Sequence, residues 1–176
     1  MVQYRRSRAP GGTYFFTIAL NDRRSRLLVD HVGLLANAVR DVRHARPFAL
    51  DAIVVLPDHL HAVLTLPCGD ADYPGRWRAV KARFARELRR AGLPLRRNRS
   101  GEYDLWQRRF WEHRIRGERD FAVHVDYIHF NPVKHGHVTR VDDWPYSSFH
   151  RYVRLGILPA DWAGGSVDRP DGGFGE

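Results

Sequence analysis

Two apolar segments separated by a short turn constrain this chain more than any other feature of its sequence. Residues 48–56 (FALDAIVVL) and 59–66 (HLHAVLTL) are rich in β-branched and aliphatic side chains, as strands are. The dipeptide Pro57-Asp58 between them is typical of a turn. With so few residues available to reverse the chain, the two strands can only pair antiparallel, and we therefore expect a β-hairpin.

The periodicity of the other segments places this hairpin in a larger α+β fold. Strands are predicted at 13–20 and 102–115, and helices at 27–46, 73–91, 120–130 and 147–155. Pro132 is expected to limit the helix at 120–130. The order β-α-β-β-α-β matches the ferredoxin-like arrangement, an antiparallel sheet with two helices on one face, followed here by an additional C-terminal helix.

Length and composition favour one intracellular domain. The 176 residues, 43% of them hydrophobic, suffice for a single core, which we place in residues 1–160, and the glycine-rich tail 161–176 is expected to be disordered. The basic residues 1–10 lack a following apolar run, and no stretch approaches the ~18 apolar residues of a membrane span. Cys68 is the only cysteine, which excludes an internal disulfide and a zinc-finger framework. We expect a cytoplasmic, nucleoid-associated protein.

A formal net charge of +9, carried mostly by arginine, predicts a nucleic-acid partner. Basic residues interleaved with aromatic ones suit a phosphate backbone and unpaired bases, and many of them lie between Arg76 and Arg99. The residues predicted to contact DNA are Arg5, Arg6, Arg8, Arg83, Arg86, Trp106, Arg108 and Arg109. A solvated basic surface over core aromatics is the alternative, and GC-rich coding would explain part of the arginine excess.

His59 and His61 are the first candidates for a site of chemistry. Side chains at i and i+2 of a strand share a face, so the two imidazoles project together while the aliphatic residues of 60–66 point to the other face. Two imidazoles on one rigid strand form half of a divalent-metal site. Considered alone, however, the pattern more often reflects ordinary polar residues on a solvated strand face.

The segment 126–133 (DYIHFNPV) is the second candidate. Tyr127 and Asn131 are four residues apart and share a helix face. A phenol has an unperturbed pKa of about 10, so a phenolate that attacks a phosphodiester needs a nearby cation. The amide oxygen of Asn131 suits a hard ion such as Mg²⁺ or Mn²⁺. A half-buried helix aromatic and a C-cap before Pro132 explain the same residues without chemistry, and spacing alone favours that explanation.

Four segments give the chain a resemblance to a known family. They are 56–66 (LPDHLHAVLTL), 106–116 (WQRRFWEHRIR), 126–136 (DYIHFNPVKHG) and 142–152 (DDWPYSSFHRY). The chain resembles the REP-associated tyrosine transposases, a branch of the single-tyrosine HUH transposases, over most of residues 13–155. The pairing of His-Leu-His with the downstream Tyr-Ile-His-Phe-Asn-Pro-Val is the most specific part of this resemblance.

The resemblance implies a reaction and the residues that carry it. In that family two histidines, here His59 and His61, bind a catalytic divalent ion (Mg²⁺ or Mn²⁺). The tyrosine that opens the downstream motif, here Tyr127, is the nucleophile, and the amide one turn later, here Asn131, completes the metal site. The implied activity is cleavage and rejoining of single-stranded or hairpin (REP palindrome) DNA through a 5′-phosphotyrosine bond, with no small-molecule substrate.

Two other functions stay open at this point. A non-catalytic nucleic-acid-binding module on a ferredoxin-like fold would bind DNA or RNA without divalent metal and would form no cleaved product. A metal nuclease that uses water as nucleophile would cut DNA and leave no protein attached to either end, and Tyr127 would then be structural.

Overall fold

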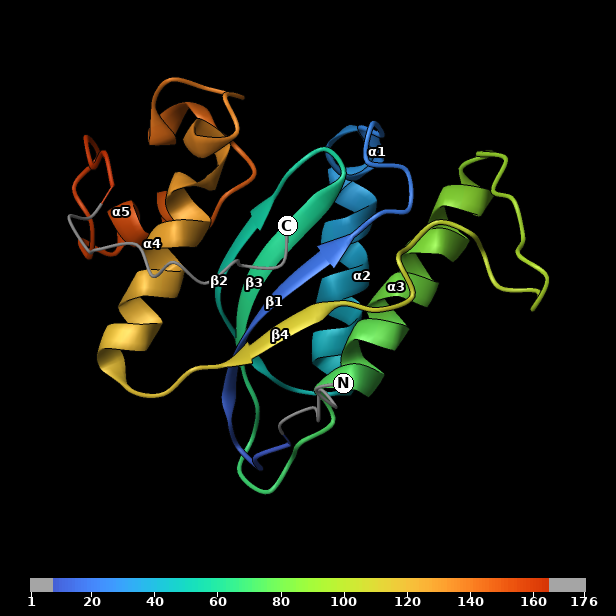
Figure 1. The fold of residues 1–176 in the computed structure, drawn as a ribbon, viewed down its shortest axis with the longest axis horizontal. Coiled ribbons are helices and arrows are strands. Elements are labelled where there is room, and N and C mark those ends of the chain that lie inside the picture. Colours follow the sequence, from blue (N-terminus) through green and yellow to red (C-terminus); the bar gives the residue numbers. More distant parts are fainter. Residues whose placement is uncertain (1–7, 165–176) are drawn as a thin grey trace, which may run out of the picture.

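A computed structural model describes residues 8–164, which contain a four-stranded antiparallel sheet (Figure 1). In spatial order the strands are β2 (Ala49–Val55), β3 (His59–Thr65), β1 (Thr13–Ala19) and β4 (Trp111–Arg114). The first strand of the sequence therefore lies inside the sheet and the last at its edge, as in the ferredoxin-like arrangement. The predicted α+β class and antiparallel sheet are confirmed.

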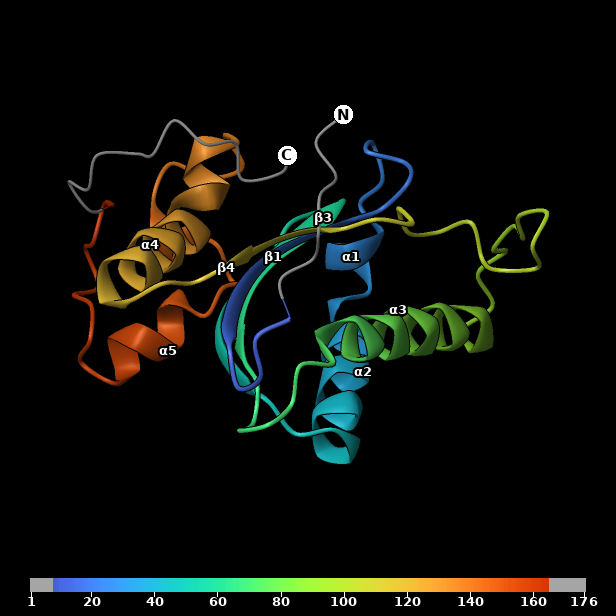
Figure 2. The same ribbon diagram turned by 60° about the horizontal axis from the view of Figure 1, so that its bottom comes forward.

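The helices divide between the two faces of the sheet (Figure 2). One face is covered by α2 (Val32–Ala45) and α3 (Tyr73–Arg90), and the other by α4 (Glu118–Lys134), which packs on β2 and β3. The shorter elements are α1 (Leu27–Asp30), the 3-10 helix η1 (Val141–Asp143) and α5 (Phe149–Arg154). The additional C-terminal helix of the prediction is thus α4.

Alternation along β1 sends neighbouring aromatic side chains to opposite helical layers. Phe16 meets Trp77 of α3 with ring centroids 5.5 Å apart, whereas Phe15 meets Tyr127 of α4 at 5.9 Å. Both phenylalanines are fully buried. Burial of one such side chain contributes roughly 1.5–3 kcal/mol. The central strand therefore anchors both layers, and the sheet is covered on both faces.

The predicted hairpin is present and closes tightly. β2 and β3 pair antiparallel, and the N–H of Leu56 donates to the carbonyl of His59 at 2.8 Å. The carbonyl of Asp58 in the turn accepts a hydrogen bond from Leu20, just after β1. These two hydrogen bonds hold the turn and fix the start of the strand that carries the two histidines.

The predicted strand at 102–115 is wrong over most of its length, since only Trp111–Arg114 is a regular strand. The ladder register pairs Trp111 with Thr17, so Ala19 would face Arg109 if it continued. Instead the carbonyl of Ala19 accepts from Gln107 at 2.9 Å, and two residues bulge out. The bulge turns Phe110 toward the α3 layer, 5.9 Å from the ring of Phe16, and leaves the adjacent arginines exposed.

The predicted helix at 27–46 is interrupted. His31 has φ −122° and ψ 32°, which separates α1 from α2. The amide of Leu28 donates to the carbonyl of Pro57, 3.1 Å away, so the first turn docks on the β2–β3 turn. This long-range contact sets the direction of α1 independently of α2, and apolar periodicity alone does not reveal it.

The prediction that Pro132 limits the preceding helix is also wrong, because α4 continues through Pro132 to Lys134. A proline inside a helix removes one backbone hydrogen bond, which costs about 3 kcal/mol. Here Pro132 is buried, and the last turn is closed by the His135 N–H on the Asn131 carbonyl at 3.0 Å. Gly136, with φ +69°, then ends the helix. Packing and the closing bonds offset the cost of the proline.

The ends of the chain bear on three predictions. Arg5, Arg6 and the tail residues 165–176 lie outside the described residues. Trp162 packs 6.0 Å from Phe149 and 6.2 Å from His129, so the packed part of the chain extends past the predicted boundary at residue 160. Within residues 8–164, no helix combines the length and the apolar character needed to cross a bilayer.

Candidate active site and nucleic-acid interface

β3 presents His59 and His61 side by side beneath α4. Their ring centroids are 5.0 Å apart, and the two residues are 2% and 0% exposed. The alternative of two polar residues on a solvated strand face is therefore wrong. Burying an imidazole costs hydration energy unless its nitrogens are engaged, so the partners of these rings decide what the pair can do.

The ring of His59 is oriented by the carboxylate of Asp58. Nδ1 lies 2.9 Å from Asp58 Oδ1, and Asp58 is itself paired with Arg23 at 2.8 Å. Burial lowers the pKa of His59 below its ordinary value, against the opposing effect of Asp58. A neutral ring whose Nδ1–H donates to a carboxylate carries its lone pair on Nε2. That Nε2 is buried and has no hydrogen-bond partner among the described residues.

The ring of His61 is oriented from the neighbouring strand. Thr17 is its direct cross-strand partner, and Thr17 Oγ1 lies 2.9 Å from His61 Nδ1. With Nδ1 engaged in this way, Nε2 is the atom of His61 suited to a metal ligand. Both histidines thus have Nδ1 held by an oxygen, which is the arrangement that orients imidazoles around metal ions.

Tyr127 meets His61 from α4. Its ring centroid is 5.3 Å from that of His61, and the residue is partly exposed. The ammonium of Lys134, two helical turns further on, donates to the phenol oxygen at 3.2 Å and lies 4.8 Å from the ring centroid. A cation beside the phenol oxygen favours its anionic form. The site therefore combines a hydroxyl, a cation and two imidazoles within a small region.

Asn131 follows Tyr127 by one turn on the same helix. The explanation of Asn131 as a helix C-cap is wrong, because α4 continues beyond it and the residue is fully buried. Two imidazole nitrogens and an amide oxygen are all uncharged donors that divalent ions accept. His59 Nε2, buried and with no hydrogen-bond partner among the described residues, is an atom that such an ion would satisfy.

A basic groove lies on the other side of the sheet, between α3 and the bulged segment before β4. It has a volume of about 670 Å³ and is lined by Arg78, Lys81, Arg86, Trp106, Arg108 and Phe110, among others. The Lys81 ammonium lies 5.7 Å from the Trp106 ring and 5.5 Å from the Phe110 ring. Cations and aromatic faces in one groove suit the backbone and bases of a single strand.

Comparison with known proteins gives a clear relationship, although no protein-family model matches the chain. A REP-associated tyrosine transposase of Escherichia coli (strain K12) is 47% identical over 168 residues, which cover 96% of this chain and 94% of that protein. This chain belongs to the REP-associated tyrosine transposases. The resemblance predicted from the sequence motifs is confirmed.

Two further comparisons agree with the family. A Haemophilus influenzae protein described by the same family name is 46% identical over 166 residues, 93% of this transposase and 94% of the relative. A solved structure of a REP-associated tyrosine transposase bound to a REP hairpin has a TM-score of 0.84 at 47% identity and covers 98% of each chain. The fold described above is therefore the fold of the family.

This transposase does not gather all the residues predicted to contact DNA on one surface. Those that line the groove are Arg86, Trp106 and Arg108, and those exposed outside its lining are Arg8 and Arg109. Arg83 is paired with Asp41 of α2 at 2.9 Å and does not line the groove. The groove therefore accounts for part of the predicted set.

Three residues of the site are absent from the sequence-based prediction. Asp58 counts there only as a turn residue, although a carboxylate next to a candidate metal-binding histidine is a signal in itself. Thr17 becomes apparent only through strand pairing. Lys134 lies seven residues after Tyr127, on the same helix face, but the expectation that Pro132 limits the helix hides it.

Proposed function

We propose that this transposase cleaves and rejoins single-stranded or hairpin DNA through a covalent bond between Tyr127 and a 5′ phosphate. The supporting observation is the position of the Tyr127 ring, 5.3 Å from the ring of His61, with the Lys134 ammonium 3.2 Å from the phenol oxygen. A related transposase has been solved bound to a REP hairpin, which supports a hairpin as the substrate.

His59, His61 and Asn131 would hold the divalent ion, through two imidazole nitrogens and one amide oxygen. When bound, Mg²⁺ or Mn²⁺ supplies Lewis acidity that polarises the scissile phosphodiester. Because all three ligands are uncharged, they would not neutralise the charge of the ion, and that full charge would act on the phosphate. Asp58 would accept the Nδ1 proton of His59, so that Nε2 of the same ring keeps its lone pair for the ion.

In the cleavage step the Tyr127 phenol releases its proton to solvent and its oxygen bonds to phosphorus. The bond from phosphorus to the 3′ oxygen breaks, and that oxygen takes up a proton to become a free 3′-OH. Lys134 stabilises the negative charge on the attacking oxygen. The phosphotyrosine conserves the energy of the broken diester, so attack by a 3′-OH reverses the step and rejoins DNA without ATP.

The basic groove would hold an unpaired part of the same DNA. Trp106 and Phe110 offer ring faces, and Lys81 and Arg108 offer charge. β4 is one of the two edge strands of the sheet, and in this proposal the DNA passes around it from the groove toward Tyr127. A cytoplasmic, nucleoid-associated location follows from a DNA substrate and belongs to the same proposal.

Substitution of Tyr127 by phenylalanine tests the proposal directly. Tyr127→Phe removes the nucleophilic oxygen and little volume, so we expect loss of the covalent protein–DNA adduct by at least about 10³-fold while hairpin binding persists. The measurement is a denaturing gel of the pure protein incubated with labelled hairpin oligonucleotides and Mg²⁺ or Mn²⁺.

Tyr146→Phe is the matched control, because Tyr146 is another partly buried tyrosine outside α4. It should form adduct at the wild-type level. An adduct that survives Tyr127→Phe would refute the assignment of the nucleophile. Cut DNA with no protein on either end would favour the water-using nuclease, and metal-independent binding with no product would favour the non-catalytic module.

A further inference from the structure

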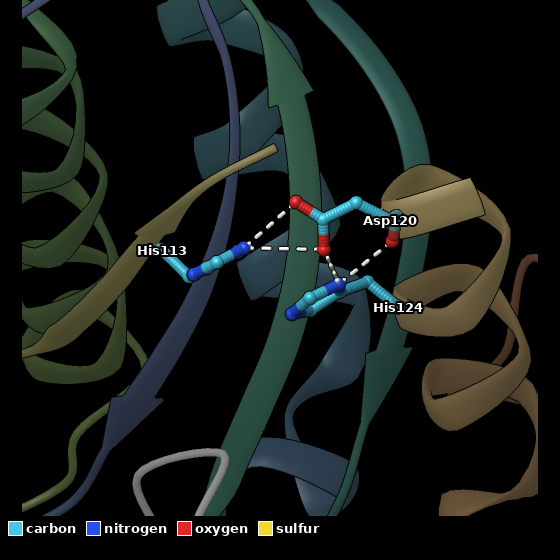
Figure 3. Close-up of side chains that lie close together, drawn as sticks. All are labelled: His113, Asp120 and His124. Carbon is cyan, nitrogen blue, oxygen red and sulfur yellow. Dashed lines mark hydrogen bonds and ion pairs between the residues drawn. The ribbon is translucent and has the colours of Figure 1, made fainter. Parts of the chain in front are cut away.

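A second group of metal-binding side chains lies at the start of α4. His113 comes from β4, and Asp120 and His124 come from the first two turns of α4 (Figure 3). One nitrogen or oxygen atom from each residue lies within 4.8 Å of the atoms from the other two. These three residues are distinct from His59, His61 and Asn131, and the proposed reaction does not use them.

The geometry of this group centres on the Asp120 carboxylate. His113 Nε2 is 2.9 Å from one carboxylate oxygen, and His124 Nδ1 is 3.0 Å from the other. The two imidazoles are stacked, with ring centroids 4.6 Å apart and planes 11° apart, and their nitrogen edges both face Asp120 (Figure 3). Two ligand atoms at about 2.0–2.2 Å from a tetrahedral ion lie about 3.3 Å from each other. The two nitrogen–oxygen distances are close to that value, and the near-parallel imidazole planes have to rotate before both lone pairs point at one ion.

The protonation states suit metal binding. Burial raises the pKa of Asp120, but hydrogen bonds from His113 and from the Arg116 N–H outweigh it, and the net pKa is below the ordinary value. Burial lowers the pKa of His124, chiefly by excluding water from the ring. A carboxylate and a neutral imidazole are the forms that bind metal ions. The carbonyl of Asp120, 2.8 Å from His124 Nδ1, adds a further oxygen beside the group.

We propose that His113, Asp120 and His124 form a second divalent-metal site that fastens the start of α4 to β4. Two imidazole nitrogens with one carboxylate suit a borderline ion such as Zn²⁺ better than Mg²⁺, which prefers oxygen ligands. On binding, the ion would replace the hydrogen bonds from His113 Nε2 and His124 Nδ1 to Asp120, and each imidazole would carry its proton on its other nitrogen. This proposal does not require the proposed function.

The site would act on the position of the tyrosine rather than on the DNA. The ring of His124 lies 4.8 Å from that of Phe15, and Phe15 lies 5.9 Å from Tyr127 and 5.4 Å from His61. An ion that ties His124 to β4 would therefore restrain the packing against which Tyr127 rests. His113, Asp120 and His124 would be positioning residues, since they act through Phe15 and the helix.

The test is a titration of the full chain with Zn²⁺ alone, in which isothermal calorimetry measures the number of ions bound. His113→Gln removes one ligand at a residue whose side chain is 36% exposed, so folding should be retained. We expect this variant to bind one equivalent of Zn²⁺ fewer than the wild type. His44→Gln, at an exposed histidine of α2, is the matched control and should bind the wild-type number.

A companion variant separates the two metal sites. His59→Gln should keep the equivalent that His113→Gln loses, whether or not the proposed catalytic site binds Zn²⁺. Excess Zn²⁺ should raise the melting temperature of the wild type and of His59→Gln more than that of His113→Gln.

Equal stoichiometry in the wild type and His113→Gln would overturn the proposal, as would an affinity weaker than about 1 mM for the equivalent in question. The three side chains would then be a metal-free hydrogen-bonded group. Circular dichroism checks that each variant is folded. Should His113→Gln fail that check, Asp120→Asn, which keeps the shape and removes the charge, replaces it with the same expected loss.

Discussion

The two faces of the sheet are both buried, yet they are built from different chemistry. Under α2 and α3 the sheet presents aromatic and aliphatic side chains such as Phe16, which packs on Trp77. Under α4 it presents His59 and His61. Among the described residues, every buried histidine lies on this second face or on α4 itself: His59, His61, His124 and His129.

The difference separates a face that mainly supplies stability from the face to which we assign catalysis. Apolar burial stabilises the fold by about 25 cal/mol per Å² without further requirements. A buried imidazole loses hydration energy and needs a partner for each nitrogen. The α4 face is therefore the more costly one, and Asp58 and Thr17 are the partners that compensate for the two histidines of β3. We expect substitutions on the two faces to separate stability from catalysis.

The largest expected effect comes from two adjacent phenylalanines of β1. Phe16→Ala and Phe15→Ala each create a cavity at a fully buried position and should lower the free energy of unfolding by about 3–5 kcal/mol. Only Phe15→Ala should also reduce adduct formation per folded molecule, because Phe15 contacts Tyr127 and His61. Chemical denaturation measures the first quantity and a denaturing gel the second. An equal loss of activity per folded molecule in both variants would contradict the division between the faces.

The two lysines of the chain sharpen the comparison, because one lies on each side. Lys134→Met removes the cation beside the Tyr127 oxygen and should slow adduct formation on the order of 10²-fold with hairpin affinity little changed. Single-turnover adduct formation at saturating DNA is the measurement.

Lys81→Met is the matched control in the groove. It should weaken binding and lower the salt dependence of the affinity by about one unit of slope, with little effect on the rate at saturation. If Lys134→Met instead changes affinity alone, the ammonium serves DNA binding and not the nucleophile.

The smallest expected effect is a pH dependence of stability that originates on the α4 side. Burial, assisted by Arg151, lowers the pKa of His129 from 6.5 to about 3. Between these values the unfolded chain binds a proton that the folded chain does not, so stability rises with pH and falls on acidification. From pH 7.5 to pH 5.5 this residue should account for a loss of about 1 kcal/mol in the free energy of unfolding.

His129→Gln should remove that part of the loss, whereas His44→Gln, on the exposed surface of α2, should keep it. Urea denaturation at the two pH values provides the comparison for each variant against the wild type. The same pH dependence in His129→Gln as in the wild type would show that another group is responsible.

The sequence-based predictions succeeded where the structure depends on neighbouring residues and failed where it depends on contacts between distant segments. The hairpin and the shared face of His59 and His61 were predictable, because strand alternation and a short turn are local. The break at His31 and the bulge before β4 were not, since each depends on a hydrogen bond to a distant segment. Arg76 is a further example: it belongs to the basic run of α3 but is 3% exposed and paired with Asp70 at 2.7 Å.

The sequence by itself determined the order of the elements, the family and the pairing of two histidines on one strand with a tyrosine on a later helix. These properties rest on spacing along the chain, and backbone geometry translates spacing into faces. Only the tertiary structure decided that α4 buries the histidines, that Lys134 reaches Tyr127 past Pro132, and that His113 meets Asp120 and His124. Those outcomes depend on how a helix packs on a sheet, which is set by side chains far apart in the sequence.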